Sequence, residues 1–265
     1  MKISRKVLNR YVKRMSMLNE KAARLISAYL AAHAIETGYD MAMLISYSYS
    51  VATKYGEGAA ALAAQMYDAI AELSDVYVPP AVPAQTATIE ETARTIQGAR
   101  LFSKDPDVTA SAVGRLVKQA GEDTTMQNAM RDGAEAAWIP SGDTCAFCLT
   151  LASRGWQKVS KRSLRKGIHA EHIHNNCDCV HMVRFDSLRS GEYYYDGEQS
   201  QVEGYDPEKY YQMYKSEPGS PKQKINALRR KAYAENKDEI NAQKRSAYAK
   251  RRELNSSAAE EIKID

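Results

Sequence analysis

All four cysteines of the chain and four of its five histidines lie between residues 138 and 185. A Cys-x2-Cys pair is followed downstream by the pattern His-x2-Cys-x-Cys. In a Cys-x2-Cys turn two thiolates can bind the same tetrahedral ion, and a second group further along can supply the other two ligands. Zinc suits thiolate and imidazole ligands and needs no redox chemistry. The spacing therefore predicts a zinc site whose candidate ligands are Cys145, Cys148, His174, Cys177 and Cys179.

The zinc site that these residues predict is structural. The candidate ligand set is Cys145, Cys148 and Cys179 with either Cys177 or His174 as the fourth ligand. Four protein ligands leave little room for an open coordination position. Two alternatives stay open: thiols that are free or become disulfides in an oxidising medium, and a catalytic metal. The neighbouring histidines, His181 among them, are expected to be exposed or to lie beside the ligands.

Two enzyme signatures fit the same residues only in part. Nucleobase deaminases have His-x-Glu before Pro-Cys-x-x-Cys, whereas here Cys-x2-Cys comes first and follows Thr144. HNH-type nucleases also combine cysteine knuckles with histidines, but His172-Ile-His174 lacks their neighbouring Asp-His and proline. No nucleophile elbow, phosphate loop, dinucleotide fingerprint or His-Glu-x-x-His is present. We therefore expect no enzyme, and keep a zinc-finger-type, HNH-like nuclease as the alternative.

The elements that must position these residues begin with helices. Apolar residues recur at steps of three and four over residues 8–30, which predicts an amphipathic helix. Asp40 is the predicted N-cap of a second helix, which Gly56 and Gly58 interrupt before an alanine-rich helix follows. The VPPAVP segment at 78–83 cannot continue a helix and is interpreted as a connector.

Further helices are expected before residue 138. Thr88-Ile-Glu-Glu has the pattern of a capping box. Asp107 and Asp123 are candidate N-caps, so two or three helices should follow Thr88. Residues 1–137 are therefore predicted to form a helical domain.

The remaining chain differs in character, although the fold class stays mainly α. Residues 138–190 are predicted to form a small, metal-clipped α+β module, in which 179–185 reads as a strand. A Tyr/Gly-rich connector at 191–220 follows. Residues 221–265 are predicted to be a basic helical tail with two 15-residue repeats.

Positive charge is concentrated at the two ends of the chain. The net charge is only +4, but residues 1–24 carry eight Lys/Arg against one acid, and residues 221–252 carry eleven against three. Such ends contact polyanions or dock on acidic protein surfaces. The candidate nucleic-acid contacts of the tail are Arg229, Arg230, Lys231, Lys244, Arg245, Lys250, Arg251 and Arg252.

Composition excludes other classes. Of 265 residues 44% are hydrophobic and 26% charged, which is ordinary for a packed globular protein. No run of about 18 apolar residues occurs, so we expect no membrane span. The basic N-terminus lacks the apolar stretch of a secretory signal, so an intracellular protein is expected.

Several segments resemble the phage Mu protein F-like minor capsid proteins, in the branch found in tailed phages and prophages of Gram-positive bacteria. The specific part is Trp138–Gly155 with its Cys-x2-Cys, together with His174-x2-Cys-Asp-Cys179 and Gly204-Tyr-Asp-Pro207. The helical stretch 51–68 is also similar, and the resemblance covers roughly residues 20–215.

This resemblance implies a structural minor head protein present in few copies. It would act near the portal in head assembly and in DNA packaging or ejection, with the portal and other capsid proteins as partners and packaged double-stranded DNA on the tail. Its location would be the virion head, and the host cytoplasm during assembly. The resemblance implies the same five metal ligands. Some relatives are fused to a protease domain, but 265 residues leave no room for one, so no protease activity is expected. A DNA-binding accessory protein without a capsid role is a further alternative.

Overall fold

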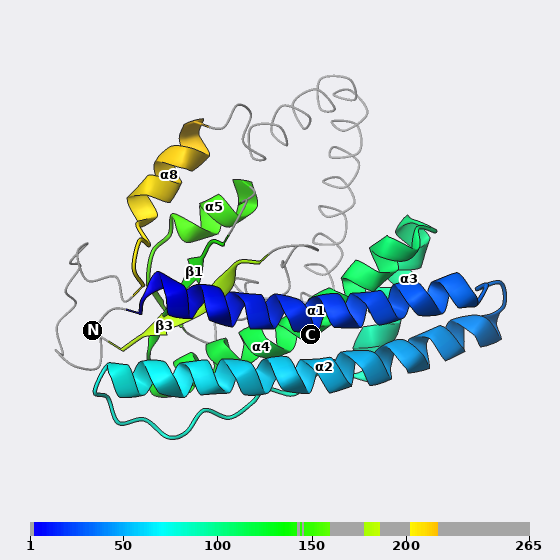
Figure 1. Cartoon of the computed structure of the whole chain (residues 1–265), viewed down its shortest axis with the longest axis horizontal. Helices are drawn as coiled ribbons and strands as arrows, with labels where there is room; N and C mark the ends of the chain where they lie inside the picture. The colour runs from blue at the N-terminus through cyan, green and yellow to red at the C-terminus, as the bar shows by residue number, and fades with distance from the viewer. Residues whose placement is uncertain (1–2, 142–143, 145, 160–177, 186–201, 217–265) are drawn as a thin grey trace, which may run out of the picture. The chain divides into compact units, whose positions relative to one another are not determined.

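The computed structural model describes residues 3–141, 144, 146–159, 178–185 and 202–216. The chain divides into two units, Met1–Tyr214 and Lys215–Asp265, and nearly all of the second lies outside the described residues. The described part is mainly helical, as the sequence predicted, and it contains a small three-stranded sheet (Figure 1). Its elements are α1 (Arg5–Ala32), α2 (Gly38–Leu73), α3 (Ile89–Phe102), α4 (Pro106–Asp132), β1 (Glu135–Ile139), α5 (Ala146–Ala152), β2 (Gln157–Lys158), β3 (Val180–Arg184) and α8 (Pro207–Ser216).

The long helices α1 and α2 run side by side in opposite directions, and α4 packs against both of them (Figure 1). α1 confirms the helix predicted over residues 8–30. The N-cap of α2 is Thr37 and not Asp40. The Thr37 hydroxyl accepts from the Asp40 backbone N–H, and the Asp40 carboxylate accepts from the Thr37 N–H in return. Asp40 is therefore the second half of a capping box. These bonds lower the pKa of Asp40, the backbone N–H of Thr37 contributing most.

The interruption predicted at Gly56 and Gly58 is wrong, because α2 continues through both residues. A Cβ atom on Gly56 would lie 2.9 Å from the Thr86 Cγ2 atom. The glycine is therefore needed for close packing, and the packing stabilises a helix that glycine alone weakens. A glycine in a helix can mark a close approach as well as an end.

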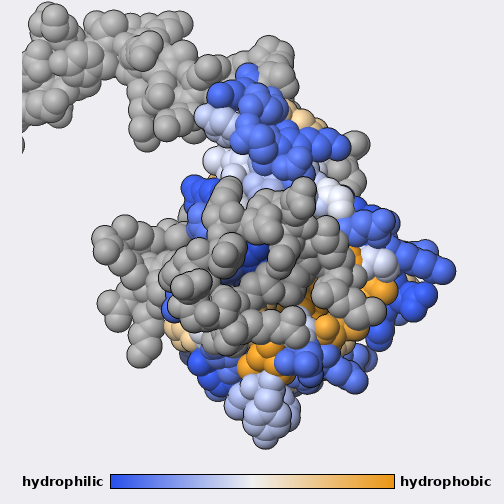
Figure 2. Space-filling model, turned by 90° about the vertical axis from the view of Figure 1, so that its left-hand side faces the viewer, coloured by the Kyte–Doolittle hydropathy of each residue, from blue (hydrophilic) through white to orange (hydrophobic). Residues whose placement is uncertain are grey.

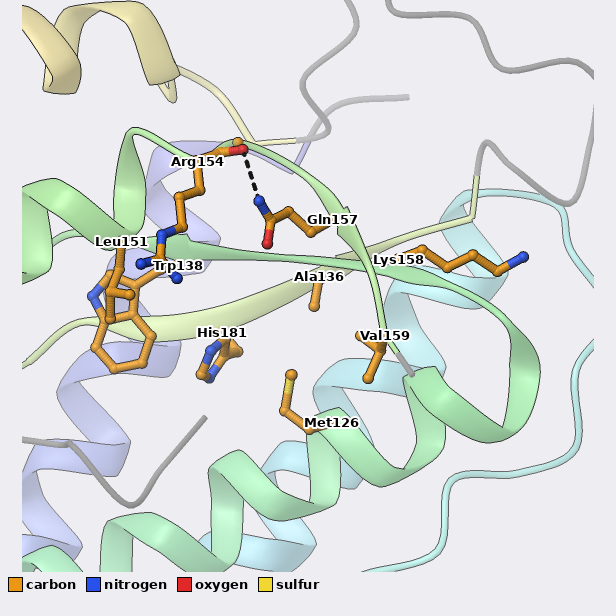
Figure 3. Close-up of a pocket in the computed structure, with 10 residues that line it drawn as sticks. Met126, Ala136, Trp138, Leu151, Arg154, Gln157, Lys158, Val159 and His181 are labelled. Atoms are coloured by element: carbon orange, nitrogen blue, oxygen red, sulfur yellow. Dashed lines mark hydrogen bonds between the residues drawn. The ribbon is translucent and has the colours of Figure 1, made fainter. Parts of the chain in front are cut away.

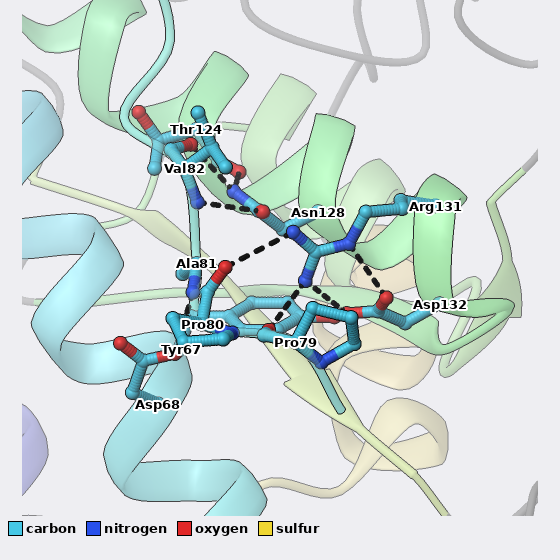
Figure 4. A network of polar contacts seen from close by, with 10 residues as sticks. All are labelled: Tyr67, Asp68, Pro79, Pro80, Ala81, Val82, Thr124, Asn128, Arg131 and Asp132. Atoms are coloured by element: carbon cyan, nitrogen blue, oxygen red, sulfur yellow. Dashed lines mark hydrogen bonds and ion pairs between the residues drawn. The ribbon is translucent and has the colours of Figure 1, made fainter. Parts of the chain in front are cut away.

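The connector predicted at 78–83 is confirmed: no helix or strand forms between α2 and α3, and the segment lies along α4 (Figure 4). Asn128 pairs with Val82 as a neighbouring strand would, accepting its N–H at 2.9 Å and donating to its carbonyl at 2.8 Å. The Arg131 guanidinium donates to the carbonyls of Pro79 and Pro80. Polar groups of α4 thus satisfy backbone atoms that have no partner in a regular element.

α4 is one continuous helix, and neither of the N-caps expected in this region, Asp107 and Asp123, is correct. Asp105 is the N-cap and accepts from the Asp107 N–H at 2.9 Å, while Asp123 lies inside the helix. Thr88 is confirmed as the N-cap of α3, since its hydroxyl accepts from the Glu91 N–H, which is one of the two hydrogen bonds of the predicted capping box. α4 ends at Gly133, whose φ of 68° is the left-handed conformation that glycine adopts without strain.

Replacing Gly121 with alanine is expected to lower the free energy of unfolding by about 1–2 kcal/mol. A Cβ atom at this position of α4 would lie 2.7 Å from the Met15 Cε atom and 3.2 Å from the Ala59 carbonyl oxygen. The Met15 side chain would have to shift, and the backbone of α2 at Ala59 would have to give by a few tenths of an ångström. Gly98 is the matched control, because a Cβ atom there meets nothing within 4 Å, and Gly98→Ala should stabilise the protein by about 0.5–1 kcal/mol. Urea unfolding followed by circular dichroism measures both; equal effects would contradict the close packing.

The three strands form an antiparallel sheet in the order β2-β1-β3. β3 confirms the strand predicted within 179–185. β1 has all five residues buried, since α4 and α5 both pack against it. It crosses residue 137, where the sequence placed the end of the helical domain. Tyr67 of α2 meets Phe185 edge to face, with ring centroids 5.4 Å apart, so the sheet and the helices share one hydrophobic core.

The described surface is largely polar. Figure 2 shows hydrophobic residues gathered in one area of the face that it presents, with hydrophilic residues around them. Among the described helices none is long and apolar enough to cross a membrane.

Candidate metal centre

Two of the five predicted zinc ligands lie among the described residues, and both are buried. Cys148 lies on α5 and is 1% exposed, and Cys179 immediately precedes β3 and is 2% exposed. Both belong to the hydrophobic core that the sheet shares with the helices. The other three candidates, Cys145, His174 and Cys177, lie outside the described residues.

The donor set suits a soft, positively charged ion. A thiolate in an apolar surrounding is costly unless a cation neutralises it, which zinc does when it binds cysteine. Within the described part of the chain, no group of three or more His, Cys, Asp or Glu side chains is arranged to hold a metal. Since three candidates lie outside that part, the zinc site stays a prediction.

The segment after α5 is fixed by a second part of the chain. Gly155 has a φ of 68°, and a Cβ atom on it would lie 3.3 Å from the Pro207 Cγ atom. The Tyr205 hydroxyl donates to the Ala152 carbonyl at 2.8 Å, which closes the C-terminal end of α5. The Trp156 ring meets the Tyr205 ring edge to face at 5.8 Å. Residues 204–207 are therefore packed directly on the segment that carries the Cys-x2-Cys pair.

His181 on β3 is buried at 5% exposure, so of its two expected positions, exposed or beside the ligands, the first is ruled out. Its Nδ1 atom lies 2.6 Å from the Glu122 Oε2 atom, and its backbone N–H donates to the same oxygen at 2.9 Å. The Trp138 ring covers the imidazole edge to face, with centroids 4.6 Å apart. The pair ties β3 to α4 two residues after Cys179.

Glu122, the partner of His181, is the residue of this site that the sequence did not indicate. It is 1% exposed, and its charge adds to the effect of burial in raising the pKa of Tyr11, which comes from α1. Three elements, α1, α4 and β3, thus meet around one carboxylate. The available signal was that α4 carries small and apolar residues on nearly every side, so that a glutamate in its middle must be buried and paired.

The cavity beside this pair is small. It has a volume of about 30 Å³ and is lined by Met126, Trp138, Arg154, Val159 and His181 among others (Figure 3). This is room for about one water molecule. His181 and Trp138 both line this cavity (Figure 3). The arrangement is that of a structural junction.

The eight cations proposed as nucleic-acid contacts, between Arg229 and Arg252, all lie outside the described residues. The DNA-binding prediction for the tail is therefore carried by the sequence alone.

The described residues define a mainly helical protein with a small sheet and buried cysteines. A family model with the description "VG15 protein" matches residues 2–217, and the chain belongs to this family of viral (phage) proteins. No curated protein and no solved structure matches the chain.

Proposed function

We propose that the chain is a structural minor capsid protein of a tailed phage or prophage, of the Mu F-like kind, which acts near the portal in head assembly and in DNA packaging or ejection. The family match over residues 2–217 supports a phage protein. The finer role is supported by the resemblance of Trp138–Gly155, His174–Cys179 and Gly204–Pro207 to minor capsid proteins.

The observation that carries this proposal is the packing of two of those segments on each other. Residues 138–155 and 204–207 are about 50 residues apart in sequence, yet Pro207 lies against Gly155 and Tyr205 bonds to Ala152. Segments that carry a family resemblance and also pack on each other are expected of one structural module rather than of unrelated short matches.

Zinc and DNA belong to the same proposal. A structural zinc ion held by four of Cys145, Cys148, His174, Cys177 and Cys179 would add to the stability of a module whose described residues pack in the core shared with the helices. The basic tail, 221–265, would contact packaged double-stranded DNA through its lysines and arginines, which displace counterions from phosphates.

Co-sedimentation with assembled phage heads tests the role directly. We expect the chain to sediment with heads in few copies when the portal protein is present, and to be absent from heads assembled without it. Absence from both kinds of head would overturn the proposal. A magnesium-dependent nicking activity that is lost in His174→Ala would instead support the nuclease.

A further inference from the structure

The exposed face of α1 carries a continuous row of cations. At 100° per residue, six lysines and arginines fall within an arc of about 100° around the helix. All six are exposed. We call this row the α1 basic face, and it consists of Lys6, Arg10, Lys13, Arg14, Lys21 and Arg24.

The packing of α1 fixes the direction in which this face points. The opposite side of the helix is buried, with Leu8, Met15 and Ile26 at most 1% exposed. The N-terminal end is anchored as well, because the Ile3 carbonyl accepts from the Glu203 N–H at 2.9 Å and the Arg5 N–H donates to the Glu203 carboxylate. In Figure 1, α1 lies in front of α4 and the sheet. Because the opposite side of α1 packs in the core, the α1 basic face points to the solvent.

Acidic partners lie away from the row. Asp178 and Asp107 accept hydrogen bonds from Ser16 and Ser27, which lie on the flank of α1 that faces α4. The one acid on α1, Glu20, pairs with Arg24 at 3.3 Å, and both side chains are about two-thirds exposed or more (66% and 71%). Among the described residues, the other five cations of the face have no ion pair within 4 Å.

The net charge of α1 is positive, whereas that of its neighbour α2 is negative. α1 has seven Lys/Arg and one acid, whereas α2 has one Lys and four acids. A face that serves only solubility mixes both signs. Like charges at i,i+4, such as Lys6 with Arg10 and Arg10 with Arg14, also repel each other by about 0.2–0.5 kcal/mol per pair. A bound polyanion would relieve this repulsion.

We propose that the α1 basic face binds the phosphate backbone of duplex DNA. From Lys6 to Arg24 the row extends about 27 Å, since each helical residue rises 1.5 Å. That length corresponds to about eight base pairs at 3.4 Å per step along one strand. The side chains would bind phosphates irrespective of base sequence, because phosphate contacts carry position and charge but no sequence information.

Duplex DNA fits this face better than a protein partner does. The face is the convex outside of a helix, and the one large apolar residue within the row is Met17, at 45% exposure. A stable protein interface needs a buried apolar centre, from which lysine is depleted. Binding to phosphates requires only the positive charges. The inference concerns a site separate from the tail, and it does not depend on the role of the protein in the head.

The test is the salt dependence of duplex binding by the full chain. The variant Arg10→Gln/Lys13→Gln/Arg14→Gln removes three charges while keeping good helix formers. The matched control, Lys54→Gln/Lys104→Gln/Lys209→Gln, removes three exposed charges from other described elements. A third variant, Arg10→Lys/Lys13→Arg/Arg14→Lys, keeps the charge and should bind as the wild type does. Fluorescence anisotropy with a 30-base-pair duplex gives the affinity at each salt concentration.

We expect the α1 variant to reduce the slope of log K against log salt by about 2.5, and to weaken binding by roughly two orders of magnitude at 0.1 M salt. The control should change the slope by less than about 0.5. The comparison is repeated in chains in which all eight candidate DNA contacts of the tail are replaced by glutamine, so that the tail contributes far less to binding.

An unchanged slope in both backgrounds, or an equal loss in the control, would overturn the proposal. The proposal would also be overturned if the wild type bound poly-glutamate, the α1 variant lost this binding, and both bound the duplex with the same affinity. The α1 basic face would then bind an acidic protein. Co-sedimentation of the α1 variant with heads separates this failure from failure of the head role.

Discussion

Replacing Glu122 with alanine is expected to lower the free energy of unfolding by about 3–5 kcal/mol. The substitution removes the acceptor of both the His181 backbone N–H and the His181 Nδ1 atom, at a site where both side chains are at most 4% exposed. The imidazole and the N–H would remain buried without a partner from α4. Urea unfolding followed by circular dichroism measures the loss.

Two further variants make this prediction specific. Glu122→Gln keeps the shape and one acceptor oxygen, so we expect it to lose clearly less stability than the alanine variant. Glu57→Ala removes an exposed carboxylate from the middle of α2 and should change stability by no more than about 0.5 kcal/mol. If Glu122→Ala behaved like Glu57→Ala, the His181–Glu122 pair would not hold β3 to α4.

The helices could be predicted from the sequence because their signals are local. The apolar repeat of α1 and the helix start at Thr88 each lie within a few turns of chain, and both are confirmed. The strand at 180–184 was also predictable, from its two valines and the Phe185 that follows it. These elements agree with their local preferences, so tertiary packing did not have to override them.

The errors arise where a distant contact decides. Gly56 appeared to end a helix, but its packing partner Thr86 lies 30 positions further along the chain. Asp123 appeared to begin a helix, but α4 is held on several sides by α1, α2 and the sheet and continues through it. β1 shows no alternation because both of its faces are covered.

The candidate site shows the same division. The Cys-x2-Cys spacing is local and could be found from the sequence, whereas the pairing of Glu122 with His181 joins residues 59 positions apart. Composition does not reveal which buried acid will meet which histidine. The basic residues of α1 were visible as a count, but the exposure of all six on one face depends on which side of the helix the core covers.

Removing zinc from the native protein is expected to have the largest effect on the 138–185 region. We expect the purified chain to contain about one zinc ion, and a strong chelator to make this region sensitive to protease. The free energy with which zinc binds a structural site, about 10–16 kcal/mol, is comparable to or larger than the stability of a whole domain. Limited proteolysis with mass spectrometry locates the cuts, and metal analysis gives the stoichiometry.

The helices should largely survive this treatment, because α1, α2 and α4 pack mainly on one another. Far-ultraviolet circular dichroism should therefore fall only slightly while the protease cuts appear. Adding Zn²⁺ back should restore resistance and adding Mg²⁺ should not, because thiolate and imidazole ligands select the softer ion. In the absence of chelator, Cys145→Ser should make the 138–185 region equally sensitive to protease. A chain that contains no zinc and keeps its protease resistance in chelator would show that Cys148 and Cys179 stay in the core without zinc.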